Sequence, residues 1–159
     1  MQNNNVVIFF ICILCNISIP GFPQYLHSSA KMNVNIKKSE FVFKRTSSSQ
    51  CHASSIVETK NGILVTWFEG THEGHQDVCI YTSELKDGEW TAPVLVADGI
   101  IMNDSLQYPC WNPVLFRYND EIFLYYKIGS NPRSWWGVYK VSNDEGKSWS
   151  SVKNLRNGI

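Results

Sequence analysis

The feature that most restricts the fold is the segment 142–149, which reads Ser-Asn-Asp-Glu-Gly-Lys-Ser-Trp. Asp144 can accept hydrogen bonds from backbone N–H groups, and Gly146 can adopt the positive φ that a tight turn requires. Trp149 can return to the sheet as an apolar anchor. The segment therefore predicts a hairpin turn between antiparallel strands. We expect structural roles for Ser142, Asp144, Gly146 and Trp149.

The sequence around this turn is repeated. Residues 56–67 and 114–125 each contain an apolar strand, an Asn-Gly or Asn-Asp turn and a second apolar strand. Residues 79–83 match 138–142 as a third strand, and residues 83–90 form a decayed copy of the turn with Ser and Trp at the same separation. A unit of strand, turn, strand, long loop, strand, turn and strand predicts the blades of a β-propeller.

The chain length limits the number of blades. A blade needs roughly 40 to 60 residues and a closed ring needs at least four blades, so a chain of 159 residues holds about two. We expect an all-β fold in which a partial propeller domain, 31–159, contains blade one at about 50–97 and blade two at about 108–155. A strand-like run at 40–44 precedes them. We interpret the chain as the N-terminal portion of a longer propeller.

The N-terminus carries an apolar run at residues 6–19. It is short for a membrane span and has the length of a signal-peptide core. We predict a signal peptide and leader over 1–30, a secreted protein and no membrane span after cleavage. The alternative is an uncleaved membrane anchor. Cys12 and Cys15 lie inside the run, so their spacing indicates neither redox nor metal chemistry.

Charge and cysteine content exclude several kinds of partner. The formal net charge is zero and no basic run is present, which argues against nucleic-acid binding. After the leader, three cysteines remain, so at most one disulfide can form among them and the sequence does not select the pair. They are Cys51, Cys79 and Cys110. No metal-ligand spacing is present, and we expect neither metal nor cofactor. Residues 103–105, Asn-Asp-Ser, form a glycosylation sequon.

Candidate catalytic residues lie in blade one. His52 stands where an inner strand begins, a position that faces the mouth of a propeller channel. It is either a proton-transfer group or a half-buried histidine bonded to backbone. The loop 68–78 holds Glu73 and Asp77, which are either an acid/base pair or part of a solvated acidic loop. His72 and His75 in this loop give only a weak metal signal.

Candidate binding residues lie in blade two. Residues 108–115 align with the beginning of blade one, so Trp111 and Asn112 are expected to face the same mouth. The loop 125–137 is aromatic and cationic. Aromatic rings stack on the CH faces of a pyranose, and cations bind its carboxylate. The candidate binding residues in this blade are Trp111, Asn112, Lys127, Arg133 and Trp135.

Five segments together resemble the BNR-repeat-like, sialidase-family branch of propeller proteins. They are Cys51-His52-Ala53-Ser54, the loop 70–78, the segment 109–113, the loop 131–137 and the turn 142–149, which resembles the Asp-box. The resemblance covers roughly residues 41 to 155.

This resemblance to the sialidase (neuraminidase) superfamily implies a six-bladed propeller that removes terminal sialic acid. Such enzymes use an arginine triad, an Asp acid/base and a Tyr nucleophile assisted by Glu. Here Cys51-His52-Ala53 occupies the position of the family's Arg-Ile-Pro. By the resemblance, Asp77 or Glu73 matches the acid/base, while the nucleophile would lie in further blades, so we expect this polypeptide alone to be inactive.

Three functions are therefore compared. The first is part of a secreted, sialidase-like glycoside hydrolase that acts on a terminal acidic sugar. The second is a non-catalytic carbohydrate-binding propeller. The third is a polysaccharide lyase in which His52, together with a Tyr, removes a proton beside a uronate. We favour the hydrolase, with a glycan or glycoconjugate as its partner.

Overall fold

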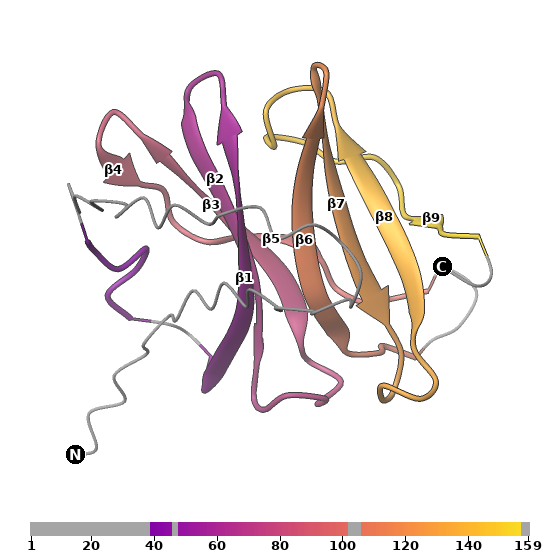
Figure 1. The fold of residues 1–159 in the computed structure, drawn as a ribbon. Coiled ribbons are helices and arrows are strands. Elements are labelled where there is room, and N and C mark those ends of the chain that lie inside the picture. Colours follow the sequence, from indigo (N-terminus) through magenta and orange to yellow (C-terminus); the bar gives the residue numbers. More distant parts are fainter. Residues whose placement is uncertain (1–38, 46–47, 102–105, 157–159) are drawn as a thin grey trace, which may run out of the picture. The chain divides into compact units, whose positions relative to one another are not determined.

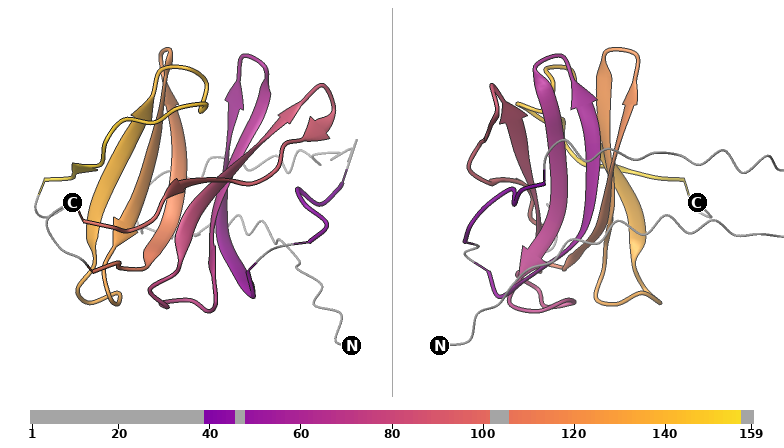
Figure 2. Two further views of the ribbon diagram at one scale, coloured as in Figure 1. Left: turned by 180° about the vertical axis from the view of Figure 1, so that it is seen from behind. Right: turned by 60° about the vertical axis from the view of Figure 1, so that its left-hand side comes forward.

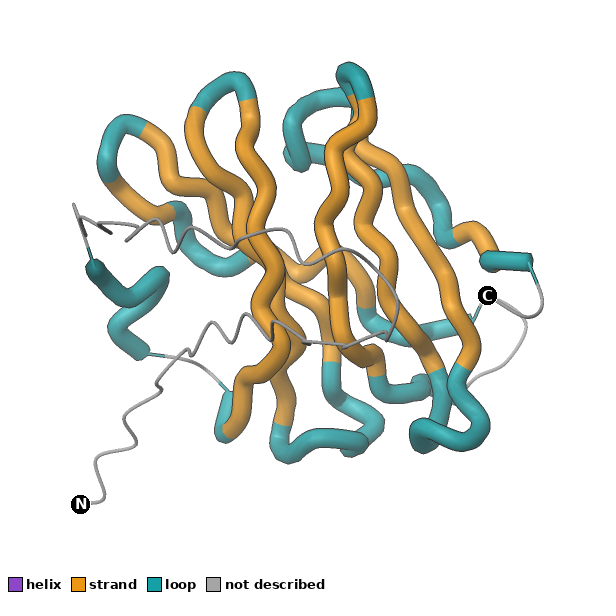
Figure 3. Tube along the Cα trace, viewed as in Figure 1, coloured by secondary structure: helices purple, strands orange, loops and turns teal. Residues whose placement is uncertain are grey.

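The structure is a computed structural model that describes residues 39–45, 48–101 and 106–156. The described residues from Val42 onward belong to one compact unit, and they contain strands and loops but no helix (Figure 1, Figure 3). In chain order the strands are β1 (Gln50–Thr59), β2 (Gly62–Gly70), β3 (Cys79–Lys86), β4 (Glu89–Trp90), β5 (Val94–Ala97), β6 (Cys110–Tyr118), β7 (Glu121–Ile128), β8 (Trp136–Ser142) and β9 (Lys153–Asn154).

The strands form two antiparallel sheets. The first has the order β1-β2-β3-β4, with β5 also paired to β3, and the second has the order β6-β7-β8-β9. Each sheet is a meander like a propeller blade, and we call them blade one and blade two. The all-β, blade-like architecture predicted from the sequence is confirmed.

Alternating side chains explain why the two sheets pack together. Along β7, every second residue is buried, whereas Phe123, Tyr125 and Lys127 are only half-buried. The buried side contributes Ile122 and Leu124, both with 0% exposure, to a core shared with β2, β3 and β6. Burying one such side chain contributes about 1.5–3 kcal/mol. The strands β1 and β6 lie side by side at this junction (Figure 1, Figure 2).

Both blades begin with the same irregularity. The register of β1 shifts between His52 and Ser55, and the register of β6 shifts between Trp111 and Val114. Ala53 and Asn112 have the positive φ values of 52° and 43° at these bulges. The predicted alignment of the two blade beginnings is therefore confirmed, and His52 is the structural equivalent of Trp111.

The third strands correct the sequence alignment by two residues. Trp67 pairs with Tyr81 in blade one, while its equivalent in blade two, Tyr126, pairs with Val138. The loop before β3 is thus two residues longer than the loop before β8. Because of this shift, Leu85 and not Ser83 is the equivalent of Ser142.

The segment 83–90, which the sequence predicts to be a decayed copy of the turn at 142–149, is therefore a different kind of turn. Leu85 pairs with Trp90 across the connection 86–89, and its central residues Asp87 and Gly88 have φ values of 52° and 85°. A two-residue turn of positive φ is the usual solution for a hairpin. A further correction concerns the strand-like run at 40–44, which forms no strand; Phe43 instead packs on the Trp67 ring, with centroids 5.1 Å apart.

The Asp-box segment forms the turn predicted for it. The Asp144 carboxylate accepts the Ser148 amide at 2.9 Å and the Ser148 hydroxyl at 2.5 Å. Ser142 Oγ donates to Asp144 and accepts the amide of Gly146 at 2.8 Å. Gly146 has a φ of 87°, and a Cβ at this position would lie 2.6 Å from Leu64 of blade one. The turn therefore also packs against the neighbouring blade.

Several sequence predictions lie outside the described residues. These are the signal peptide at 1–30 and the sequon at 103–105. Across the described ranges no helix has the length and apolar character needed to cross a membrane. Cys51, Cys79 and Cys110 are all free thiols.

Candidate functional site

Loops of both blades meet at one end of the sheets. The β2–β3 loop, 71–78, and the β7–β8 loop, 129–135, lie at the lower edge in Figure 1, opposite the Asp-box turn. The amide of Cys110 at the start of β6 donates to the carbonyl of Val78 at 2.9 Å, which joins the blades at this end. The predicted site residues of both blades therefore lie on one edge of the compact unit.

Trp111 lies where the two loops meet. Its indole N–H donates to the carbonyl of Gly129 at 2.8 Å, and its side chain is almost fully buried. Its ring contacts Trp135 edge-to-face at a centroid distance of 5.5 Å and Phe68 of blade one at 6.5 Å. A Cβ on Gly74 would lie 3.1 Å from this ring. Trp111 is therefore a packing residue that connects the two loops.

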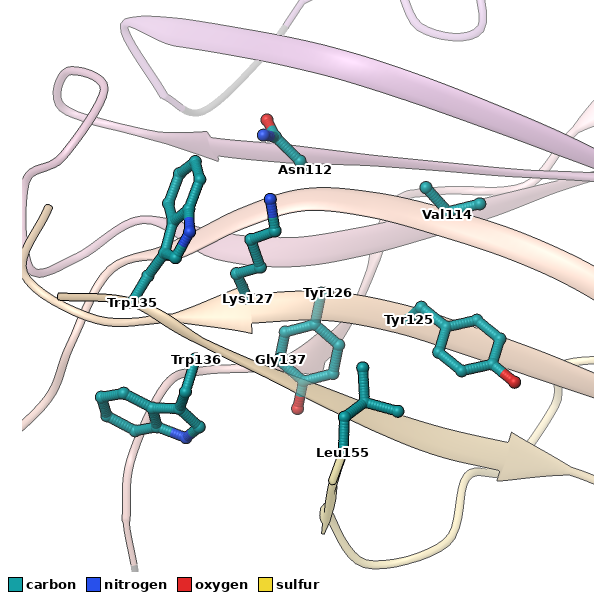
Figure 4. A pocket seen from close by; sticks show the side chains of 9 residues that line it. All are labelled: Asn112, Val114, Tyr125, Tyr126, Lys127, Trp135, Trp136, Gly137 and Leu155. Atoms are coloured by element: carbon teal, nitrogen blue, oxygen red, sulfur yellow. The ribbon is translucent and has the colours of Figure 1, made fainter. Parts of the chain in front are cut away.

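A cavity of about 350 Å³ opens beside Trp135 on blade two. Its lining residues are Asn112, Val114, Tyr125, Tyr126, Lys127, Trp135, Trp136, Gly137 and Leu155. The Lys127 ammonium lies 4.0 Å from the centre of a Trp135 ring, and its side chain extends toward the amide of Asn112 (Figure 4). Three of the five predicted binding residues therefore line one cavity.

The chemistry of this cavity combines apolar walls with a few polar groups. Aromatic rings supply flat surfaces for CH groups, Asn112 offers both a donor and an acceptor, and Lys127 supplies a positive charge. A cation on an aromatic face gains about 0.5–1 kcal/mol at an exposed site, so Trp135 holds the ammonium in place. The cavity suits a ring-shaped, hydroxylated ligand that carries a negative charge.

The other predicted binding residues lie outside this lining. Trp111 packs behind Trp135, as described above. Arg133 is exposed in the β7–β8 loop, where its backbone amide donates to Asn131 Oδ1 at 2.9 Å. Arg133 is therefore an exposed residue that does not line the cavity.

In the β2–β3 loop, Asp77 is held by Thr71. One carboxylate oxygen accepts the Thr71 amide at 3.0 Å and the other accepts its hydroxyl at 2.6 Å. These bonds, with the Thr71 hydroxyl contributing most, lower the pKa of Asp77 from 3.8 to about 2. The same two-pronged arrangement fixes Asp144 on Ser148 and lowers the pKa of Asp144 to about 2. Asp77 is therefore ionised at neutral pH and shapes its loop.

His52 and Glu73 are exposed at the same edge. The His52 ring stacks on Phe68 with centroids 5.5 Å apart. Glu73 is tied down by its backbone amide, which donates to Gln50 Oε1 at 3.0 Å. Both side chains are in contact with solvent. The structure thus places the three predicted catalytic residues on blade one, across Trp111 from the cavity.

Two residues that the sequence does not single out as acid/base groups, Glu69 and His75, make specific side-chain contacts in the structure. Glu69 is only 3% exposed and accepts the Trp67 indole N–H at 2.8 Å and the Ser48 hydroxyl at 3.2 Å. A glutamate inside an apolar strand, two residues after a tryptophan, was the available signal. The sequence gives His75 only a weak metal signal, yet this residue contacts Asp77 directly, with Nδ1 2.7 Å from Oδ1.

The cysteines are not activated nucleophiles. Burial raises the pKa of Cys79 to about 11 and also raises the pKa of Cys51 and Cys110. Within the described ranges, no group of three or more His, Cys, Asp or Glu side chains is placed to hold a metal ion. The chemistry of this edge therefore depends on carboxylate, imidazole, ammonium and aromatic groups.

Residues 61–159 match the family described as BNR repeat-like domain, a span that includes β2 to β9 and the cavity. No curated protein sequence matches the chain.

Proposed function

The chain belongs to the BNR repeat-like domain family, and we propose that it is part of a sialidase-like glycoside hydrolase that binds a terminal acidic sugar. The observation that supports this proposal is the cavity in which Lys127 lies on Trp135 beside Asn112. In this proposal the sugar ring stacks on Trp135, while its carboxylate pairs with the Lys127 ammonium. Asn112 binds a sugar hydroxyl.

The sugar class follows from the charge in the cavity. Lys127 is a point charge with three rotatable donors, whereas an arginine would bind a carboxylate through a planar fork. A lysine therefore tolerates several positions of the acid group. Both sialic acid and a uronic acid fit this chemistry, whereas a neutral sugar has no negative charge to pair with Lys127.

A second candidate function is carbohydrate binding without catalysis. One observation favours it: the pKa of Asp77 is lowered to about 2, whereas the general acid of a glycosidase needs a carboxyl that stays protonated. In that case Asp77 only shapes its loop, and the aromatic cavity carries the whole function.

To test the proposal, the full chain is titrated with monosaccharides, and binding is monitored by tryptophan fluorescence and by NMR. We expect N-acetylneuraminic acid or glucuronic acid to perturb Trp135, and galactose to bind at least tenfold more weakly. Lys127→Gln should remove the preference for the acid, and Trp135→Ala should weaken every sugar. Lys153→Gln is the matched control, because Lys153 lies 5.8 Å from the Tyr139 ring centre, outside the cavity lining. Equal binding of acidic and neutral sugars would contradict the proposal.

We also propose that the protein is secreted. The support is the apolar run at residues 6–19, followed by sequence of ordinary composition. Expression of the full chain in cells with a secretory pathway tests this. We expect the protein in the medium with a new N-terminus; retention of the intact run in the membrane fraction would instead indicate an anchor.

A further inference from the structure

An imidazole and a carboxylate are in direct contact in the β2–β3 loop. His75 Nδ1 lies 2.7 Å from Asp77 Oδ1, and the two side chains are 38% and 46% exposed. The loop fixes both groups: Thr71 holds the carboxylate, and backbone bonds of 3.0 Å join His75 to His72 and Val78 to His75. The His72 ring packs edge-to-face on the His75 ring at a centroid distance of 5.0 Å.

This contact selects a tautomer of His75. A carboxylate beside Nδ1 favours the proton on Nδ1, which leaves the lone pair on Nε2. The amide of Asp77 also approaches Nδ1, at 3.3 Å, and would favour the other tautomer. The contact with the carboxylate is shorter and assisted by charge, so it dominates. The low pKa of Asp77 keeps that charge in place at neutral pH.

The second ring nitrogen is available for a ligand. In the described part of the chain, no hydrogen bond or ion pair involves His75 Nε2. The His72 ring and the Asp77 carboxylate, both of the same loop, contact this imidazole. Among the described residues of β1, β6 and the β7–β8 loop, no ionisable group is in hydrogen-bond or ion-pair contact with it.

The pair of His75 and Asp77, which we call the dyad, also lies near the proposed sugar-binding cavity. Both lie at the edge formed by the β2–β3 and β7–β8 loops, which we call the binding edge. Gly74, the residue before His75, packs against Trp111, and Trp111 packs against Trp135 of the cavity. A glycan bound in the cavity and extending across Trp111 would therefore reach the β2–β3 loop.

We propose that Asp77 positions His75 as a proton-accepting group, whose Nε2 binds a sugar hydroxyl or a water at this edge. When Nε2 takes the proton, the imidazolium stays paired with the Asp77 carboxylate, and the hydroxyl or water oxygen becomes the stronger nucleophile. This role rests on the proposed function, because it needs a hydroxylated ligand at the edge.

Long-range ¹⁵N–¹H NMR of the full chain tests the dyad without any enzymatic activity. At pH 8 we expect His75 in the Nδ1–H tautomer. In Asp77→Asn the preference for the Nδ1–H tautomer should weaken, since the carboxylate charge beside Nδ1 is removed. His72 is the internal control: its Nδ1 contacts the carbonyl of Glu73 at 3.1 Å, so its tautomer should not change.

A second variant protects the test against a folding defect. Thr71→Val removes one hydrogen bond to Asp77 but keeps the carboxylate beside His75. We expect it to keep the Nδ1–H tautomer even though the loop is less stable. Wild-type His75 protonated on Nε2 at pH 8 would overturn the dyad, whatever the variants do.

Addition of glucuronic acid oligosaccharides separates this inference from the proposed function. We expect the Nε2 resonance of His75 to shift together with the Trp135 signals, and Lys127→Gln to abolish both shifts. If Trp135 responds and His75 Nε2 does not, the cavity function stands and the role of His75 fails. If neither responds while the tautomer is Nδ1–H, the dyad stands as a structural pair, and both the sugar-binding function and its use of His75 fail.

Discussion

Blade one and blade two follow the same backbone plan with different side chains. Each begins with a cysteine, continues through a bulge of positive φ and forms a meander. At the first position after the cysteine, blade one has the exposed His52 and blade two has the buried Trp111. Their equivalence is clear because Phe68 and Lys127 pair with them at the same register.

The difference extends to the loops that face the binding edge. The loop of blade one contains histidines and carboxylates, whereas the loop of blade two contains Trp135, which contacts Lys127 of β7. The bulges and registers are retained because they determine the path of the backbone. The side chains they carry can change, so one scaffold presents an imidazole and carboxylate surface beside an aromatic and cationic one.

The largest expected effect separates Trp111 from His52. Trp111→Ala removes a buried ring and its hydrogen bond to Gly129, so we expect a loss of about 3–5 kcal/mol in the free energy of unfolding. His52→Ala should change it by no more than about 0.5 kcal/mol, as for other surface positions. Urea unfolding measures both. Equal losses would show that the two positions are not used differently.

The next effect concerns the two hairpin turns. Gly88 and Gly146 both have positive φ, so alanine costs about 1–2 kcal/mol at each. A Cβ at Gly146 also meets Leu64, whereas a Cβ at Gly88 meets nothing within 4 Å. Gly146→Ala should therefore be about 1–3 kcal/mol worse than Gly88→Ala. The double change Gly146→Ala with Leu64→Ala should remove that difference; a difference that survives would argue against the contact between blades.

The third prediction compares Asp144 in blade two with Asp77 in blade one, because each carboxylate accepts an amide and a hydroxyl from a single residue. Each pKa falls from 3.8 to about 2 on folding, so each group stabilises the fold above about pH 4 and loses this effect as the pH falls toward 2. We expect Asp144→Asn to lower the urea midpoint at pH 6 and to match the wild type near pH 2. Asp77→Asn should lower the urea midpoint at pH 6 by less, because the Asp77 side chain is 46% exposed. If the difference in urea midpoint between the wild type and either variant stays constant with pH, ionisation of the carboxylate is not the cause of that difference.

The smallest effect is expected at the opposite end of the sheets. Lys60 of blade one pairs with Asp120 of blade two at 2.8 Å, with side chains 64% and 85% exposed. Solvent and salt screen such pairs, so Asp120→Asn should leave the urea midpoint unchanged within error. Glu145 is only 11% exposed and is bonded to Arg117 and to the Lys60 amide. Glu145→Gln should therefore be measurably destabilising, and the opposite ranking would contradict this account.

Much of the fold could be predicted from local patterns. Apolar runs on either side of an Asn-Asp turn located β6 and β7, and the spacing of Ser142, Asp144 and Gly146 located the Asp-box turn, because strands and hairpin turns depend on residues close in sequence. The match between the two blade beginnings also followed from sequence. The two-residue difference between the loops before β3 and β8 did not, since Ser83 and Ser142 align without a gap although their registers differ.

The sequence by itself determined the main strands of each blade, the repeat and the kinds of chemical group available in the loops at the lower edge in Figure 1. Only the tertiary structure decided which of these groups meet. It brought Asn112, Lys127 and Trp135 to one cavity, left Arg133 in solvent and placed His75 against Asp77. The reason is physical: apolar alternation depends on neighbouring residues, whereas contacts between side chains depend on strand register, bulge position and loop length, which are fixed only when the sheets pack.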